Sequence, residues 1–133
     1  MALERAAAHL APGGLLAMHC VNPRVLALGG DPVPKPFFTR RSVDTGNRYT
    51  RFAMSGPADE NQRQRLYGWY DEVDAEGVVR RRDYSLHWRP VFRFEAELML
   101  TRAGLEVVAL EGGHRHEPFA AASPTMFFVA RRQ

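Results

Sequence analysis

The chain begins with an apolar pattern that predicts a short helix followed by a strand. Its first apolar residues recur at the spacing of one helical face, at Leu3, Ala6, Ala7 and Leu10. Pro12, Gly13 and Gly14 then end the pattern. Residues 15–21 form a continuous apolar run of strand length, which is typical of a strand that helices cover on both faces of a parallel sheet. Asn22-Pro23 ends this strand.

The middle of the chain predicts antiparallel strands. Two glycines and three prolines crowd residues 29–36, which indicates a loop that could serve as a hinge or lid. Three segments rich in aromatic and β-branched residues follow, and turn sequences separate them; the segments are residues 48–55, 62–71 and 78–89. The third alternates, with apolar side chains at Tyr84, Leu86 and Trp88 and polar ones between them. One face of this layer should therefore pack and the other should be polar.

The last part of the chain returns to helix and buried strands. Helical spacing recurs from residue 93 to residue 103, and Gly104 stands at the usual stop position. A strand is expected at residues 105–110, a turn at Gly112-Gly113, and a final apolar strand at residues 125–130. The sequence contains no internal repeat.

Composition narrows the class of protein. The chain has 133 residues, of which 45% are hydrophobic and 25% charged, so residues 1–133 are expected to fold as a single domain. Its one cysteine, Cys20, cannot form an internal disulfide, which favours a reducing compartment such as the cytoplasm. No apolar run approaches the roughly 18 residues of a membrane span, and no secretory leader is evident at the start.

The charge of the chain gives little support for nucleic-acid binding. The net charge is +3, and Lys35 is the only lysine. The densest basic run, Arg80-Arg81-Arg82, would alternate between faces if it lies on a strand, whereas a polyanion-binding surface usually concentrates its charge. An arginine-rich nucleic-acid binder therefore stays a minor alternative to a solvated surface.

The order of the predicted elements resembles the C-terminal half of a class I S-adenosylmethionine-dependent methyltransferase. Residues 9–16, HLAPGGLL, resemble the family's turn into its fifth strand, and Asn22-Pro23 resembles the dipeptide that often follows it. Residues 97–107, ELMLTRAGLEV, resemble the junction between a helix and the sixth strand, and residues 123–131 resemble the closing strand. The three middle strands resemble the antiparallel insert of small-molecule members, including sugar N,N-dimethyltransferases.

This resemblance implies an α/β fold with two parts. One is a partial Rossmann-like methyltransferase sheet, equivalent to strands five to seven. The other is an inserted antiparallel three-stranded layer at residues 37–89, which in the family covers the pocket for a small-molecule acceptor. The family's cofactor is S-adenosylmethionine, held at the first half of the sheet by a glycine-rich turn and an acidic residue.

That first half has no counterpart in the sequence. The only glycine pairs are Gly13-Gly14, Gly29-Gly30 and Gly112-Gly113, and none gives the G-x-G-x-x-G pattern between a strand and a helix. The strand at residues 15–21 would also lack one neighbouring strand, so its apolar edge needs a cover. We expect a homodimer or another homo-oligomer, a swapped strand, a separately encoded N-terminal half, or a longer natural chain to provide it.

Seven residues are candidates for the acceptor site. His19 and Asn22 lie at the carboxyl end of the first strand, where ligands bind in open α/β sheets. His19 is the candidate catalytic residue, because an imidazole could orient the acceptor or take its proton; a histidine hydrogen-bonded within the sheet is the alternative. The candidate substrate-binding residues on the insert are Tyr67, Trp69, Tyr70, His87 and Arg89. Ordinary cross-strand packing is the alternative for them.

Other reactive patterns are weaker. His114-Arg115-His116-Glu117 supplies at most three metal ligands, so a solvated turn is favoured and no metal is expected. No motif places a base beside Cys20 or a serine, although methyl transfer needs no protein nucleophile. Two functions remain open. The chain is a fragment or split subunit of a methyltransferase, inactive alone, or it is a non-catalytic module for small-molecule binding or dimerisation.

Overall fold

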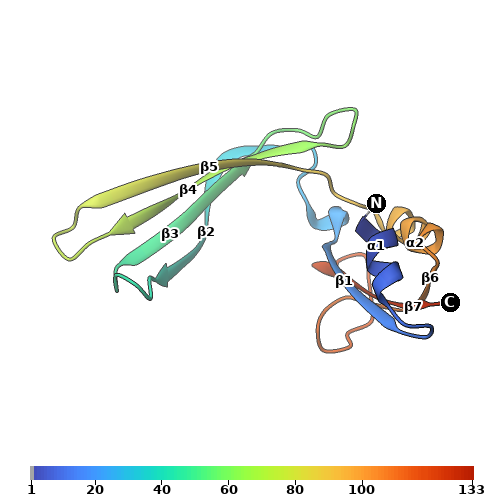
Figure 1. The fold of residues 1–133 in the computed structure, drawn as a ribbon. Helices are drawn as coiled ribbons and strands as arrows, with labels where there is room; N and C mark the ends of the chain where they lie inside the picture. The colour runs from blue at the N-terminus through green and yellow to red at the C-terminus, as the bar shows by residue number, and fades with distance from the viewer. Residues whose placement is uncertain (1) are drawn as a thin grey trace. The chain divides into compact units, whose positions relative to one another are not determined.

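The computed structural model describes residues 2–133, and these form two compact units, each with its own antiparallel sheet (Figure 1). We call residues 2–26 and 90–133 the core unit and Ala27–Arg89 the insert unit. The predicted α/β class is confirmed, because the structure combines two α-helices with two sheets. The insert unit contains the predicted insert at residues 37–89 together with the start of a strand that was not recognised in the sequence.

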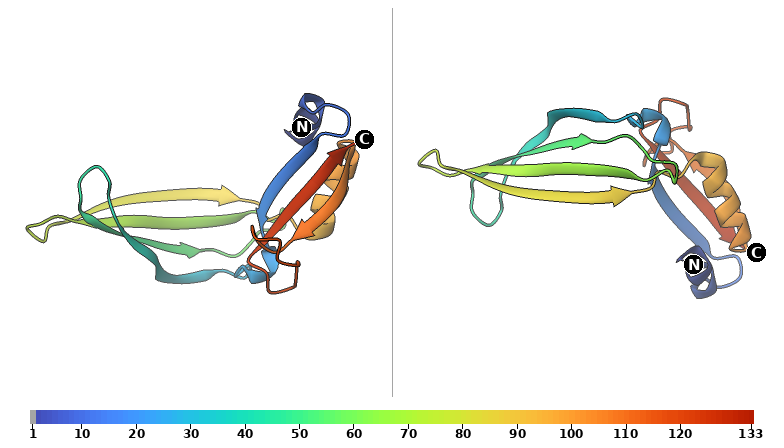
Figure 2. Two further views of the ribbon diagram at one scale, coloured as in Figure 1. Left: turned by 90° about the horizontal axis from the view of Figure 1, so that it is seen from below. Right: turned by 90° about the horizontal axis from the view of Figure 1, so that it is seen from above.

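The core unit packs two helices against one face of a three-stranded sheet. Its elements are α1 (Ala2–His9), β1 (Leu15–Val21), η1 (Pro23–Val25), α2 (Arg93–Arg102), β6 (Leu105–Glu111) and β7 (Thr125–Arg132). Strand β7 lies between β1 and β6 and is antiparallel to both (Figure 2). Gly104, with φ of 78°, ends α2 in the left-handed conformation that glycine adopts freely.

The buried core lies between the helices and alternate residues of the strands. It contains Ala7, Ala96, Leu100, Leu105, Met126, Phe128 and Ala130. Because Met126, Phe128 and Ala130 alternate along β7, they all point to the same face of the sheet, and both helices pack there. The opposite face, which carries Phe127 and Val129, has no covering helix among residues 2–133.

Strand β1 differs from its prediction in one respect. Its side chains alternate between exposed and half-buried, so the expectation that both faces are buried is wrong for this chain. Leu16, Met18 and Cys20 face the core, whereas Leu15 is 56% exposed. Strand β1 pairs only with β7, so within the described residues one of its edges is free, as the missing neighbour implied.

The insert unit is a four-stranded antiparallel meander, one strand more than predicted. Its strands are β2 (Asp31–Arg41), β3 (Arg48–Ser55), β4 (Gln64–Val73) and β5 (Val79–Trp88), in that order across the sheet. The prediction of a loop at residues 29–36 is wrong, because most of these residues belong to β2. Strand β2 tolerates three prolines because it is an edge strand, and its pairing with β3 is interrupted by two register shifts.

Hydrogen bonds within its turns fix the meander. Between β4 and β5, Asp74 Oδ1 accepts from the backbone N–H groups of Glu76 and Val78, and Gly77 adopts φ of 83°. Between β3 and β4, Asp59 Oδ1 accepts from the backbone N–H groups of Asn61 and Arg63. The aspartates of the predicted turn sequences therefore fix these turns.

Neither of the two described α-helices has the length and apolar character to cross a membrane.

Candidate functional site

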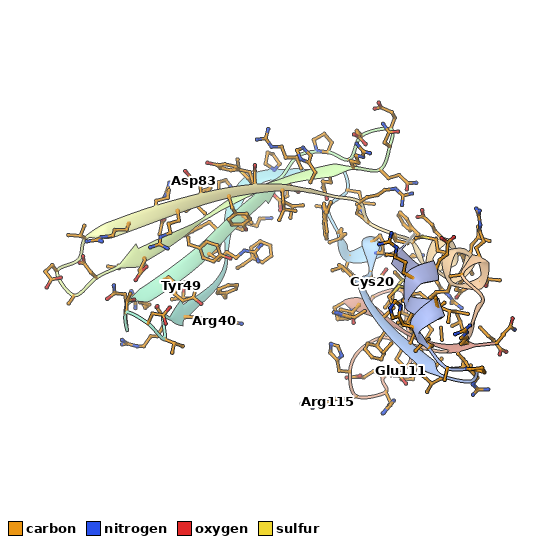
Figure 3. The ribbon with its side chains drawn as sticks, viewed as in Figure 1. Cys20, Arg40, Tyr49, Asp83, Glu111 and Arg115 are labelled. Carbon is orange, nitrogen blue, oxygen red and sulfur yellow. The ribbon has the colours of Figure 1, made fainter. Side chains whose placement is uncertain are left out.

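The two faces of the insert sheet carry different sets of predicted site residues. Residues directly opposite one another in an antiparallel pair share a face, as do alternate residues of one strand. Tyr67, Trp69 and His87 therefore lie on one side, which we call the Trp69 face. Tyr70 lies on the other side, the Tyr70 face, so the three aromatic candidates on β4 are divided between the two faces. Figure 3 labels Asp83 on the Trp69 face, and Arg40 and Tyr49 on the Tyr70 face.

An aromatic stack organises the Trp69 face. The rings of Phe52 and Trp69 stack with centroids 5.4 Å apart, and Tyr67 lies 6.1 Å from Trp69. The Arg81 guanidinium lies 4.6 Å from the centre of the Trp69 ring and makes two 2.7 Å hydrogen bonds to Asp71. These bonds, with a third from the Trp69 indole, hold the pKa of Asp71 below its usual value. The cation site over Trp69 is thus filled by the protein's own arginine.

A cavity of about 440 Å³ opens on the same face. It is lined by Pro32, Met54, Ser55, Gly56, Arg65 and Tyr67. Met54 lies directly opposite Tyr67 in the register of β3 and β4, and Arg65 lies two residues before Tyr67, so these three side chains share the Trp69 face. Apolar walls with a single charged group are typical of small-molecule sites.

The Tyr70 face carries a second aromatic row. Phe38, Tyr49, Tyr70 and Tyr84 follow one another across all four strands, with ring centroids 5.6–6.2 Å apart. Arg51 donates a 2.8 Å hydrogen bond to the Tyr84 hydroxyl. None of the three cavities found among the described residues includes Tyr70 in its lining, so cross-strand packing accounts for this residue.

The two predicted residues at the end of β5 are placed differently. His87 is exposed and lies directly opposite Arg65, beside the cavity. Arg89 lies one residue beyond the strand and donates to Gln62 Oε1 at 2.9 Å. Next to it, Trp88 Nε1 donates to Gln64, whose buried side chain also donates to two backbone carbonyls, of Ala27 and Gly56. Arg89 therefore belongs to the polar end of the sheet.

In the core unit, His19 is exposed on the uncovered face of the sheet. Its ring lies 4.9 Å from that of His114 and 6.4 Å from that of Phe127. His19 makes no hydrogen bond with another described residue. The structure therefore does not support the alternative of a histidine hydrogen-bonded within the sheet. Cys20, on the other face, is partly buried, and this burial raises the pKa of its thiol, which disfavours a nucleophilic role.

Asn22 has a structural role that differs from the predicted one. Its side chain is only 1% exposed. Both amide hydrogens are donated to backbone carbonyls, of Ala121 at 3.1 Å and Ser123 at 2.7 Å, and Oδ1 accepts from Arg24 N–H. The two bonds from the amide nitrogen hold the loop before β7, and the bond to Oδ1 caps η1. Because both amide hydrogens are donated within the protein and the side chain is buried, these contacts indicate a positioning role for Asn22 instead of the predicted substrate-binding one.

The histidine-rich turn makes one ion pair with the end of β6 and one hydrogen bond within itself. His116 Nδ1 lies 2.7 Å from Glu111 Oε1, and this hydrogen bond raises the pKa of His116. Glu117 accepts from the backbone N–H of Arg115. Within residues 2–133, no three side chains of the metal-binding types gather closely enough to hold an ion.

Sequence reasoning missed most of the cavity lining. Arg65 precedes Tyr67 by two residues on a predicted strand, so the alternation of strand residues was a signal that could have found it. Met54 and Ser55 lie on a strand whose bounds were predicted, but their neighbours across the sheet were unknown. Pro32 could not be found, because it lies on the strand that was taken for a loop.

The comparisons with known proteins place this fold among methyltransferases. No protein-family model matches the sequence, and no curated protein matches it. Among solved structures, the chain is similar to the CcbJ methyltransferase from Streptomyces caelestis, with 27% identity and a TM-score of 0.68 over 98% of this chain and 48% of that one.

Two further methyltransferase structures are also similar to the chain. S-adenosylmethionine-bound CalS10, an amino pentose methyltransferase from Micromonospora echinaspora, is 23% identical, with a TM-score of 0.71 over 99% of this chain and 49% of that one. The sugar N-methyltransferase KedS8 from a Streptoalloteichus species is 21% identical, with a TM-score of 0.63 over 99% and 47%. The predicted resemblance to small-molecule methyltransferases is confirmed, and the chain spans about half the length of each, which agrees with a C-terminal half.

Proposed function

We propose that this chain forms the acceptor-binding half of an S-adenosylmethionine-dependent methyltransferase that acts on a small molecule. The observation that carries the proposal is that the match to CcbJ extends over 98% of the chain, so it includes the insert as well as the core unit. The cavity of about 440 Å³ on the insert supports a role in holding the acceptor. His19 remains the proposed catalytic residue.

The residues of this chain do not fit the cofactor. Gly13-Gly14 connects a helix to a strand, Gly29-Gly30 precedes β2, and Gly112-Gly113 lies between two strands, so none joins a strand to a helix. A Cβ added to Gly14 would lie 2.9 Å from the Ala11 carbonyl oxygen, and one added to Gly113 would lie 2.6 Å from Glu117. Gly14 and Gly113 therefore pack against the chain's own atoms, and no glycine pair stands between a strand and a helix, where the family's phosphate-binding turn lies. S-adenosylmethionine is therefore assigned to a second half.

The free edge of β1 is the proposed docking site for that half. The outer strand β6 has a register shift between Val107 and Ala109, which disrupts a flat edge. Strand β1 instead pairs with β7 in unbroken register from Leu15 to Val21. Apart from His19, its exposed residues are apolar, and they include Leu15 and Val21. We propose that an apolar strand of the cofactor-binding half pairs here; a second copy of this chain is the competing occupant.

The test compares the chain alone with the chain joined to the segment encoded directly upstream of Met1. We expect that segment to contain an apolar strand followed by a G-x-G turn. Calorimetric titration with S-adenosylmethionine is expected to show saturable binding only to the joined protein. Saturable binding to the chain alone would contradict the assignment of the cofactor to another half, and absence of binding to both would overturn the methyltransferase proposal.

A non-catalytic module for small-molecule binding or dimerisation is the second candidate. The observation that favours it is that this chain spans only about half of each similar structure, and the matched part includes the insert unit. Such a module predicts no binding of S-adenosylmethionine by the joined protein and a dimer of the chain alone. Light scattering after size-exclusion chromatography distinguishes that dimer from the monomer.

A further inference from the structure

The cavity on the Trp69 face is lined by a basic side chain and by no acidic one. Of its six lining residues, only Arg65 is charged, and none is an acid. His87 lies directly opposite Arg65 across β4 and β5. Neither side chain makes a hydrogen bond or an ion pair with another of residues 2–133. Two basic groups thus stand side by side at the cavity, open to solvent.

Two other basic side chains of the insert are bound by acids of the protein. Arg81, on the same face, is held by Asp71 through two 2.7 Å hydrogen bonds, and Lys35 is held by Asp31 at 2.6 Å. Their charges are balanced within the protein. The Arg65 guanidinium keeps its donors for a partner outside the chain, and its planar fork matches carboxylate and phosphate oxygens.

We propose that this cavity binds an acceptor that carries an anionic group, either phosphate or carboxylate, attached to a ring. The anion accepts hydrogen bonds from Arg65 and His87, while the ring packs against Met54 and Tyr67. This inference rests on the proposed function and deepens it, because it names the chemical class of the acceptor. Arg65 and His87 are then residues that determine specificity.

The experiment measures binding of three ring compounds to the whole chain by calorimetry at low ionic strength. The probes are 1-naphthyl phosphate, 1-naphthoate and the neutral 1-naphthalenemethanol. We expect each anion to bind about tenfold more tightly than the alcohol, because a guanidinium forms charge-assisted hydrogen bonds with it. The more tightly bound anion identifies the group that the acceptor carries.

Variants locate the binding. Arg65→Gln is expected to lower the affinity for both anions to that for the alcohol, and Arg65→Lys to retain part of the difference. His87→Gln is expected to cost about threefold, since it removes one donor. The matched control is Arg48→Gln. Arg48 lies on the same face but lines a separate cavity of about 300 Å³. Its replacement should therefore leave the affinity for all three probes unchanged.

The outcomes separate this inference from the proposed function. Equal affinities for anions and alcohol, no binding of any probe, or an equal loss in Arg48→Gln and Arg65→Gln would overturn the inference and leave the methyltransferase proposal standing. Conversely, anion binding that depends on Arg65, found together with a joined protein that never binds S-adenosylmethionine, would support the anion site and overturn the methyltransferase proposal.

Discussion

The core unit and the insert unit keep their strands in place by different physical means. In the core unit, side chains such as Phe128 and Leu100 are completely buried between the helices and one face of the sheet. In the insert unit, only Ala53, Gln64 and Gly68 are buried within the strands. Its sheet depends on register, on ring stacks such as Phe52 with Trp69, and on polar contacts. A sheet with two half-exposed faces is less constrained by packing, and it is therefore free to present a binding surface.

The largest expected effect tests the dependence of the core unit on burial. Phe128→Ala should lower the free energy of unfolding by about 3–5 kcal/mol, because it leaves a cavity in the core. The control is its neighbour Phe127, on the uncovered face and half-buried, where alanine should cost about 1 kcal/mol or less. Urea denaturation measures both. Equal losses of stability would show that the two faces of β7 are equally buried in solution, and they would contradict the assignment of the core to one face of the sheet.

A smaller effect tests the close contacts of the insert. A Cβ at Gly68 would lie 2.5 Å from both the Phe52 carbonyl oxygen and the Tyr84 hydroxyl, so Gly68→Ala should cost about 1–3 kcal/mol. At Gly56 no atom lies within 4 Å of the added Cβ. Gly56→Ala should therefore change stability by no more than about 0.5 kcal/mol. Trp fluorescence during urea unfolding follows both variants, and a tolerated Gly68→Ala would contradict the register of β3, β4 and β5.

The smallest effect concerns the ion pair on the Trp69 face. The pKa of Asp71 is lowered in the folded state, chiefly by Arg81. Its stabilising contribution is therefore fully present above the unfolded pKa of about 3.9 and is lost as pH falls through the lower folded value. Asp71→Asn should flatten the decline in stability between about pH 5 and pH 2, by a small amount because Arg81 is half exposed.

The control for this ion pair is Asp44→Asn. Asp44 is exposed in the turn between β2 and β3 and makes no ion pair with a described residue. Thermal unfolding at several pH values compares the two variants. A pH profile of Asp71→Asn that coincides with that of Asp44→Asn would show that the ion pair adds nothing to the stability of the insert.

The sequence predicted elements well wherever a local signal sets them. Residues 48–55 were predicted as a strand and form β3 with the same bounds, because β-branched and aromatic residues lie between clear turns. Prolines gave a misleading signal at residues 29–36, since a proline disfavours a strand only where its missing N–H is needed. That condition depends on whether the strand is at an edge, which the local sequence does not encode.

The candidate site was predicted less completely. Trp69 and His87 were named as candidates on different strands, and only the pairing of β4 with β5 shows that they share a face. Tyr70 was grouped with Trp69 although adjacent strand residues point to opposite faces. Asn22 was expected to face a ligand, and its amide instead binds loop carbonyls about one hundred residues away along the chain. Contacts over such separations leave no periodic pattern in the sequence.

By itself, the sequence determined the order of elements, most of their bounds and the family resemblance, because helical and strand periodicity and turn residues act over a few neighbours. The tertiary structure alone decided which residues of neighbouring strands share a face. It also showed that β2 completes the insert, and that one face and one edge of β1 are open. It also brought Arg65 and His87 together beside a cavity. These features depend on pairing between strands, and register between segments is set by the packing of the whole sheet.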